Sequence, residues 1–171
     1  ANMSSFKDDF ILASGSYLLN HSVGRPLKTA EQAFSTQFFT PWQTSGREPW
    51  QDWLQVIEKF NQSLAKLFNA KVTEFCPQVN LSSALTKLIM SLERLERPNA
   101  VVLMSEVDFP SMGFVLQKAL PVTCELRFIP KELDVTDAAV WQQYISEDGD
   151  LVFVSHVNSN TGQQAPLNEI V

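Results

Sequence analysis

The chain has 171 residues, of which 44% are hydrophobic and 19% are charged, values that are ordinary for a globular domain and exclude a disordered or fibrous protein. The net charge of −6 and the lack of a basic stripe argue against a nucleic-acid-binding protein, which needs clustered Lys and Arg to neutralise phosphates. No apolar run approaches the roughly 20 residues of a membrane-spanning helix, so we expect no membrane-embedded protein. The reduced state expected of the two cysteines indicates a protein of the cytoplasm.

The two cysteines, Cys76 and Cys124, are far apart in the sequence and have no CxxC or His spacing around them. This pattern disfavours both a disulfide and a zinc site. It predicts two reduced, buried thiols and no bound metal.

Residues 1–70 differ from the rest of the chain and are predicted to form a helical amino-terminal arm. They are rich in Phe, Trp and Gln and contain no continuous apolar strand. One helical stripe has apolar residues at spacings of three and four, with Pro49 suited to its first turn. Its members are Trp53, Ile57, Phe60, Leu64 and Leu67.

Residues 71–171 alternate between helical and strand patterns, which predicts an α/β fold with a mostly parallel sheet and helices on both faces. The runs 100–104 and 151–154 are uninterrupted and apolar, as in buried parallel strands, whereas 124–128 alternates and is expected to be half exposed. Helices are expected at 81–92, 110–119 and 138–145.

Three polar junctions join these elements, and ligands of such folds gather at the carboxyl edge of the sheet. The junctions are Phe75–Ser83, Ser105–Ser111 and Ser155–Gly162. We therefore expect all three to meet at one edge.

The first junction opens a helix, whose free amides and partial positive charge suit a phosphate, although Asn80 or Ser82 could simply cap that helix. In the second, Phe109 stands where a strand ends and could stack on a planar ligand or belong to the core. In the third, His156, Asn158 and Asn160 offer polar groups, but Asn-rich segments are often only turns.

In this order the junctions resemble the aminotransferase class V family of pyridoxal-phosphate enzymes, which has the aspartate-aminotransferase (fold type I) architecture. Among its members, kynureninase is the most similar by motif. The similar segments are Tyr17–Gly24, Val79–Leu81, Phe109–Ser111 and Val157–Gln163.

The resemblance implies a transferase or lyase that binds pyridoxal 5'-phosphate and acts on an amino acid through a Schiff base. By position, Cys76, Pro77, Gln78, Phe109 and Asn158 correspond to cofactor-binding residues, and His21 and Ser22 to substrate-binding residues. It also implies a homodimer, for which Trp42, Trp50 and Trp53 of the arm could provide an interface.

The chain departs from the family pattern at three places. His21 replaces an Asn, Pro77 and Gln78 replace hydroxyl residues, and the 158–160 turn lacks an aromatic pair. The choice between transamination, desulfuration and β-cleavage of a kynurenine-like substrate stays open.

None of the eight lysines matches the family's Schiff-base lysine by position. We expect that lysine beyond Val171, with residues 71–171 forming the first part of the large domain and the chain alone inactive. An alternative is a non-catalytic α/β binding or interaction domain derived from this fold. A dinucleotide-binding fold is disfavoured because no GxGxxG follows a predicted strand.

Overall fold

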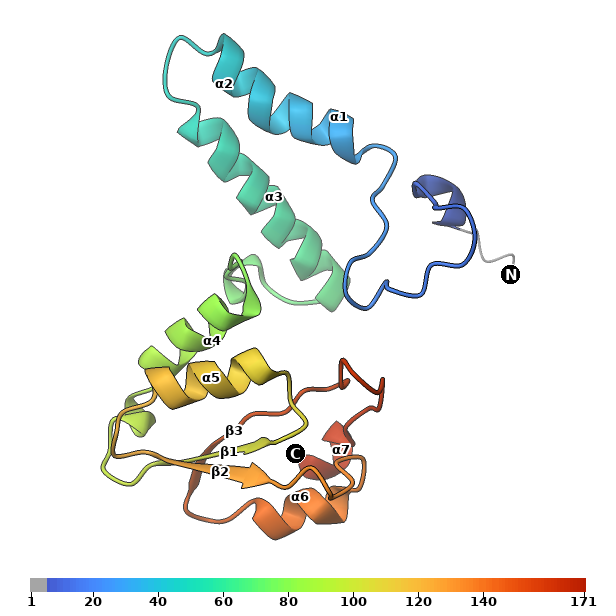
Figure 1. Ribbon diagram of the computed structural model, residues 1–171. Coiled ribbons are helices and arrows are strands. Elements are labelled where there is room, and N and C mark those ends of the chain that lie inside the picture. Colours follow the sequence, from blue (N-terminus) through green and yellow to red (C-terminus); the bar gives the residue numbers. More distant parts are fainter. Residues whose placement is uncertain (1–5) are drawn as a thin grey trace. The chain divides into compact units, whose positions relative to one another are not determined.

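The computed structural model describes residues 6–171, and the chain divides into two compact units, residues 1–77 and 78–171. Each unit is considered by itself. Figure 1 shows the helices of the first unit and the layered sheet of the second. Residues 1–5 of the predicted arm lie outside the described residues.

The regular elements of the first unit, in its described part, are helices. A run of helix over residues 30–44 is followed by the long helix α3, which Pro49 precedes and Asn69 ends in a left-handed conformation (φ 51°). The elements are η1 (Phe6–Asp9), α1 (Ala30–Phe34), η2 (Ser35–Phe39), α2 (Thr40–Thr44), α3 (Trp50–Phe68) and η3 (Val72–Glu74).

An aromatic cluster joins α3 to the preceding helical run. The rings of Phe38 and Trp53 stack with centroids 5.0 Å apart, and the Trp53 indole N–H donates to the Phe38 carbonyl at 3.2 Å. The indoles of Trp42 and Trp50 pack edge-on against Trp53. Both nevertheless remain 58% exposed, so packing within the unit uses only part of their surface.

The second unit alternates helix and strand in the order expected from the sequence. Its main elements are α4 (Leu81–Met90), β1 (Val101–Ser105), α5 (Pro110–Ala119), β2 (Glu125–Ile129), α6 (Ala138–Tyr144) and β3 (Gly149–Val152). Two short helices complete it, η4 (Glu93–Leu95) and α7 (Leu167–Ile170). The three strands are parallel and lie in the order β2-β1-β3, which confirms the predicted fold class.

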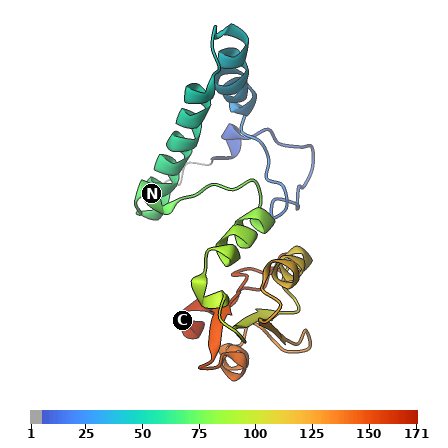
Figure 2. The same cartoon turned by 90° about the vertical axis from the view of Figure 1, so that its left-hand side faces the viewer.

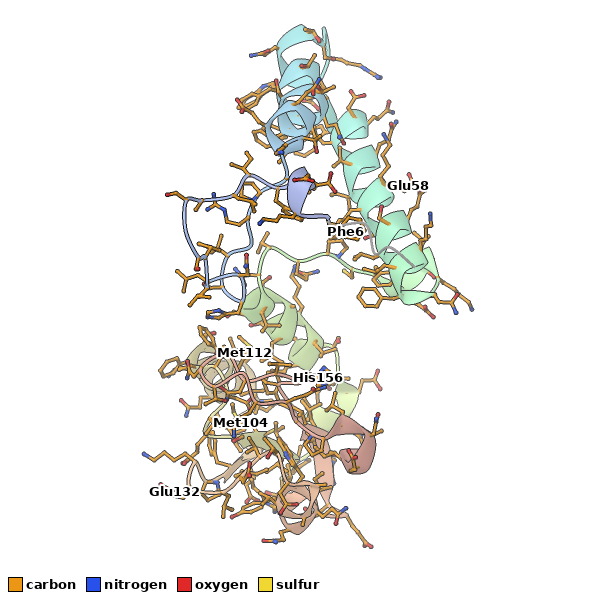
Figure 3. All side chains as sticks on the ribbon, turned by 90° about the vertical axis from the view of Figure 1, so that its right-hand side faces the viewer. Phe6, Glu58, Met104, Met112, Glu132 and His156 are labelled. Carbon is orange, nitrogen blue, oxygen red and sulfur yellow. The ribbon has the colours of Figure 1, made fainter. Side chains whose placement is uncertain are left out.

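Helices cover both faces of the sheet (Figure 2). On one face, Val102 and Met104 of β1 pack with residues of α4 and α5. On the other, Leu103 packs with Trp141 of α6, and Ile170 of α7 adds to this side. Figure 3 labels Met104 and Met112, which belong to the core beneath α4 and α5. All five residues of β1 are buried, so β1 is the centre of the unit.

Strand β3 differs from its prediction as a buried run over 151–154. It spans Gly149–Val152, and the side chains of residues 151–154 are only partly buried. The register with β1 breaks between Val101 and Val102. There the Asp150 carboxylate, which is 7% exposed, accepts the Val101 N–H at 2.8 Å.

The buried carboxylate of Asp150 is paired with a positive charge and accepts hydrogen bonds at both of its oxygens. The Arg97 guanidinium donates to both of its carboxylate oxygens, at 2.8 and 2.6 Å. These two bonds and the Val101 N–H lower the pKa of Asp150. The pair ties the start of β3 to the turn before β1.

Cys76 and Cys124 are not joined in a disulfide, but the prediction that both are buried is wrong for Cys76, which is exposed. Cys124 is half-buried, and its thiol donates to the Leu95 carbonyl at 3.2 Å. Desolvation raises the pKa of this thiol.

Within residues 6–171, no helix has the length and apolar character needed to cross a membrane.

Truncation of Leu116 tests the packing of α5 on the sheet. Leu116 is fully buried, so Leu116→Ala should lower the free energy of unfolding by about 2–5 kcal/mol through lost burial and a residual cavity. Leu88→Ala, on the 52% exposed Leu88 of α4, is the matched control and should change it by less than about 0.5 kcal/mol. Equal effects in equilibrium urea denaturation would contradict the assignment of the core.

The carboxylates near the start of β3 predict an acid-labile fold. Hydrogen bonds from Arg127 and then Ser146 lower the pKa of Asp148 to about 2, and the pKa of Asp150 is lowered too. Because these values lie below the unfolded-state value of about 3.9, their stabilisation is complete above about pH 4 and is lost as the pH falls toward about 2. The urea midpoint should therefore fall over this interval.

Asp150→Asn tests how much the ion pair between Arg97 and Asp150 contributes to the free energy of unfolding. The difference in urea midpoint between the wild type and this variant should be largest near pH 6 and should shrink below about pH 4. Glu147→Gln, at an exposed carboxylate in the same turn, is the control. A difference that stays constant from pH 6 to pH 3 would rule out the ionic contribution.

Candidate functional site

The second and third junctions lie side by side at the carboxyl edge of the sheet. β1 and β3 are adjacent and parallel, so the segments that follow them leave the sheet at the same edge. The Asn158 carboxamide of the third junction donates from Nδ2 to the Val107 carbonyl of the second at 2.8 Å. The structure thus joins two of the three predicted junctions directly.

Phe109 of the second junction directly precedes α5, in which Pro110 takes the first-turn position. Its backbone is extended (φ −58°, ψ 125°), as the residue before a proline prefers. The side chain is 53% exposed, so Phe109 is not a core residue. An aromatic ring with accessible surface therefore lies at this edge.

Two carboxylates hold the backbone between β1 and Phe109. The buried Asp108 accepts the Ser105 N–H at 3.0 Å, and Glu106 accepts the Lys131 N–H at 3.1 Å. The Glu106 N–H itself donates to the Ile129 carbonyl at 3.0 Å. The loop is thus anchored both to itself and to the end of β2.

Sequence reasoning missed these anchors. The spacing of Ser105 and Asp108 is a local turn signal that could have indicated the first. The bond from Glu106 to Lys131 spans 25 residues and leaves no local signal.

Asn158 is 8% exposed, and its side chain is engaged on both sides. While Nδ2 reaches Val107, Oδ1 accepts the backbone N–H groups of Asn160 at 2.9 Å and Thr161 at 3.3 Å. The segment is therefore a turn closed by its own Asn, as the simpler interpretation expects. Contact of Asn158 with a cofactor stays a prediction.

The first junction begins α4 with a side-chain cap. The Asn80 Oδ1 accepts the Ser83 N–H at 2.8 Å, so Asn80 does cap this helix. Gln78 Oε1 accepts from the Lys87 ammonium at 2.6 Å, which brings a cation beside the start of α4. The helix that this junction begins, α4, packs on α5, and the meeting of this junction with the other two stays a prediction.

The remaining predicted site residues belong to the first unit. Cys76 and Pro77 are exposed at its end, and His21 and Ser22 are exposed in a turn in which the Ser22 N–H donates to the Leu19 carbonyl at 2.9 Å. The two units are described separately, so the placement of these four residues at a shared site stays a prediction.

His156, labelled in Figure 3, lies in the third junction and is exposed. Its Nε2 is 2.7 Å from the Gln164 side-chain nitrogen, and both residues line a cavity of about 250 Å³ beside α7. Across the part of the chain that the structure describes, no group of three His, Cys, Asp or Glu residues is arranged to hold a metal ion.

No protein-family model matches the chain, and no curated protein sequence is significantly similar to it. Solved structures do match. A lysine-to-alanine mutant of C-DES, with glycine covalently linked to its PLP cofactor, superposes with a TM-score of 0.81 over 93% of this chain, at 22% identity. The complex of the cystine C-S lyase C-DES with cysteine persulfide gives a TM-score of 0.78 over 88% of the chain, at 22% identity.

The cysteine desulfurase CsdA from Escherichia coli matches with a TM-score of 0.72 over 96% of the chain, at 14% identity. This chain spans 42%, 40% and 44% of these three proteins, respectively. At such low identity the likeness establishes architecture. The chain therefore has the α/β fold of one part of fold-type I, pyridoxal-phosphate-dependent enzymes.

Proposed function

We propose that this chain forms part of a pyridoxal-phosphate-dependent enzyme of the class V aminotransferase group that acts on an amino acid. One observation carries the proposal. Two segments resemble the family, Phe109–Ser111 and Val157–Gln163, and the bond from Asn158 to Val107 joins the loops that carry them at one edge of the sheet. The exposed ring of Phe109 stands at that edge.

The residues at this edge fit the cofactor. Phe109 supplies a flat apolar surface for a pyridine ring. The carboxamide nitrogen of Asn158 has two hydrogens and gives one of them to Val107, so the second can be donated to the cofactor or the substrate. When bound, pyridoxal phosphate withdraws electrons from a bond at the α-carbon of an amino acid.

The phosphate is assigned to the start of α4 and the preceding residues Cys76, Pro77 and Gln78. A ten-residue helix directs backbone N–H groups and a partial positive charge toward its start. The Lys87 ammonium, 2.6 Å from Gln78 Oε1, adds a full positive charge nearby. These features favour a dianion even though the segment lacks the family's hydroxyl residues.

His21 and Ser22 are assigned to the substrate, and the whole protein to a homodimer. The exposed faces of Trp42 and Trp50 supply apolar surface of the kind found at subunit interfaces. Sedimentation of the full-length protein tests the dimer.

For the reaction, we propose a lyase or transferase chemistry most similar to that of kynureninase. The motif Phe109-Pro110-Ser111 supports the kynureninase-like form, because the desulfurases have His in place of this Phe. Desulfuration is the nearest competitor, since the solved structures with this fold include a cystine C-S lyase and a cysteine desulfurase.

A non-catalytic α/β binding module is the second candidate. It is favoured by the engagement of Gln78 with Lys87 and of both ends of the Asn158 carboxamide with backbone, because these contacts stabilise the loops without a ligand. Cofactor binding separates the two candidates.

Pyridoxal phosphate titrated into the full-length protein, followed by its absorbance near the visible edge, should bind and shift its spectrum. Phe109→Ala should weaken binding about tenfold, because the ring loses its stacking surface, whereas Phe109→His should retain most of the affinity. Phe114→Ala, at a 67% exposed Phe of the same helix, is the matched control and should bind normally.

No binding by the full-length protein would favour the non-catalytic module. Binding that is unaffected by Phe109→Ala would remove the stacking role of Phe109.

A further inference from the structure

We propose that Asn158 is a positioning residue, which fixes the loop that carries Phe109 before any ligand arrives. The inference deepens the proposed function and depends on it only for the identity of the ligand. Its basis is the 2.8 Å bond from Asn158 Nδ2 to the carbonyl of Val107, which lies two residues before Phe109. This bond links segments 51 residues apart in the sequence.

The donor is itself held rigidly. Asn158 Oδ1 accepts two backbone N–H groups of its own turn, and the Asn158 N–H donates to the Gln163 carbonyl at 2.8 Å. The turn is closed by the Gly162 N–H, which donates to the Asn158 carbonyl at 2.8 Å, and Gly162 has a φ of +72° that suits glycine. The carboxamide is therefore preoriented toward Val107.

The loop on the accepting side is also held to its own strand and, through Glu106, to the end of β2. Its first part is held by Asp108, which turns back to the Ser105 N–H, and by the Val107 N–H, which donates to Ser105 Oγ at 3.2 Å. These bonds fix the loop against its own strand. The contact with Asn158 is the bond that fixes it against the loop that follows β3.

Packing covers the ring of Phe109 only in part, because the residue is 53% exposed. Its orientation therefore depends on the backbone between Val107 and the start of α5. A ligand that stacks on a preoriented ring avoids the entropic cost of ordering it, which strengthens binding. Loss of the Asn158 bond should accordingly weaken ligand binding through the mobility of Phe109.

Asn158→Asp separates the two functions of the carboxamide. The carboxylate still accepts the Asn160 and Thr161 N–H groups, but it cannot donate to Val107. Asn160→Asp places the same charge two residues away and leaves the Asn158 carboxamide in place. It is therefore the matched control.

The readout is fluorine NMR of the full-length protein with para-fluorophenylalanine at position 109, recorded without cofactor. Asn158→Asp should shift or broaden this resonance, and it should weaken pyridoxal-phosphate binding about tenfold. Asn160→Asp should leave the resonance unchanged and binding within about twofold. Val140→Ala, which removes core volume on the opposite face of the sheet, should lower stability without moving the resonance.

An unchanged resonance in Asn158→Asp would overturn the positioning role, even if cofactor binding fell, because the loss would then come from direct contact. A changed resonance in a protein that binds no pyridoxal phosphate would support the positioning role and overturn the proposed function. The two failures are therefore distinguishable.

Discussion

The parallel pairing of β1 with both of its neighbours is the constraint on which the rest of the second unit depends. β1 is buried along its whole length, and the helices on its two faces take alternate side chains from it. Parallel strands also place their carboxyl ends at one edge of the sheet. The same pairing therefore builds the core and brings together the polar loops that follow the strands.

Different interactions stabilise the amino and the carboxyl ends of the parallel strands. At the amino edge, Arg97 and Asp150 form a buried pair that also satisfies the Val101 N–H, where the ladder between β1 and β3 is irregular. At the carboxyl edge, the neutral carboxamide of Asn158 reaches the backbone of Val107. This contact is uncharged, whereas the carboxylates of Glu106 and Asp108 in the same loop are bonded to backbone N–H groups.

Much of the fold could be predicted from the sequence, because its signals are local. The apolar stripe after Pro49 and the Pro110 that begins α5 both indicated helices that the structure contains. The bounds of β3 could not be predicted, because the partners that stabilise the charged Asp150 within the strand, Arg97 and the Val101 N–H, are about 50 residues away in the sequence. The exposure of Cys76 was likewise hidden, since cysteine is buried in most proteins.

The sequence also predicted part of the candidate site. The loop positions of Phe109 and Asn158 follow from strand and helix patterns, and the exposure of Phe109 distinguishes it from a core residue only in the structure. The hydrogen-bond acceptor for Asn158 is the backbone carbonyl of Val107. Every residue has such a carbonyl, so the sequence does not indicate which one accepts the bond. Bonds of this kind require coordinates.

Amide hydrogen exchange of the full-length protein, with and without pyridoxal phosphate, tests most directly whether the joined loops form one ligand-binding edge. Binding should add protection in residues 105–112 and 156–163 together, and it should leave residues 133–137 after β2 unchanged. Protection confined to other segments, or to only one of the two loops, would contradict this account.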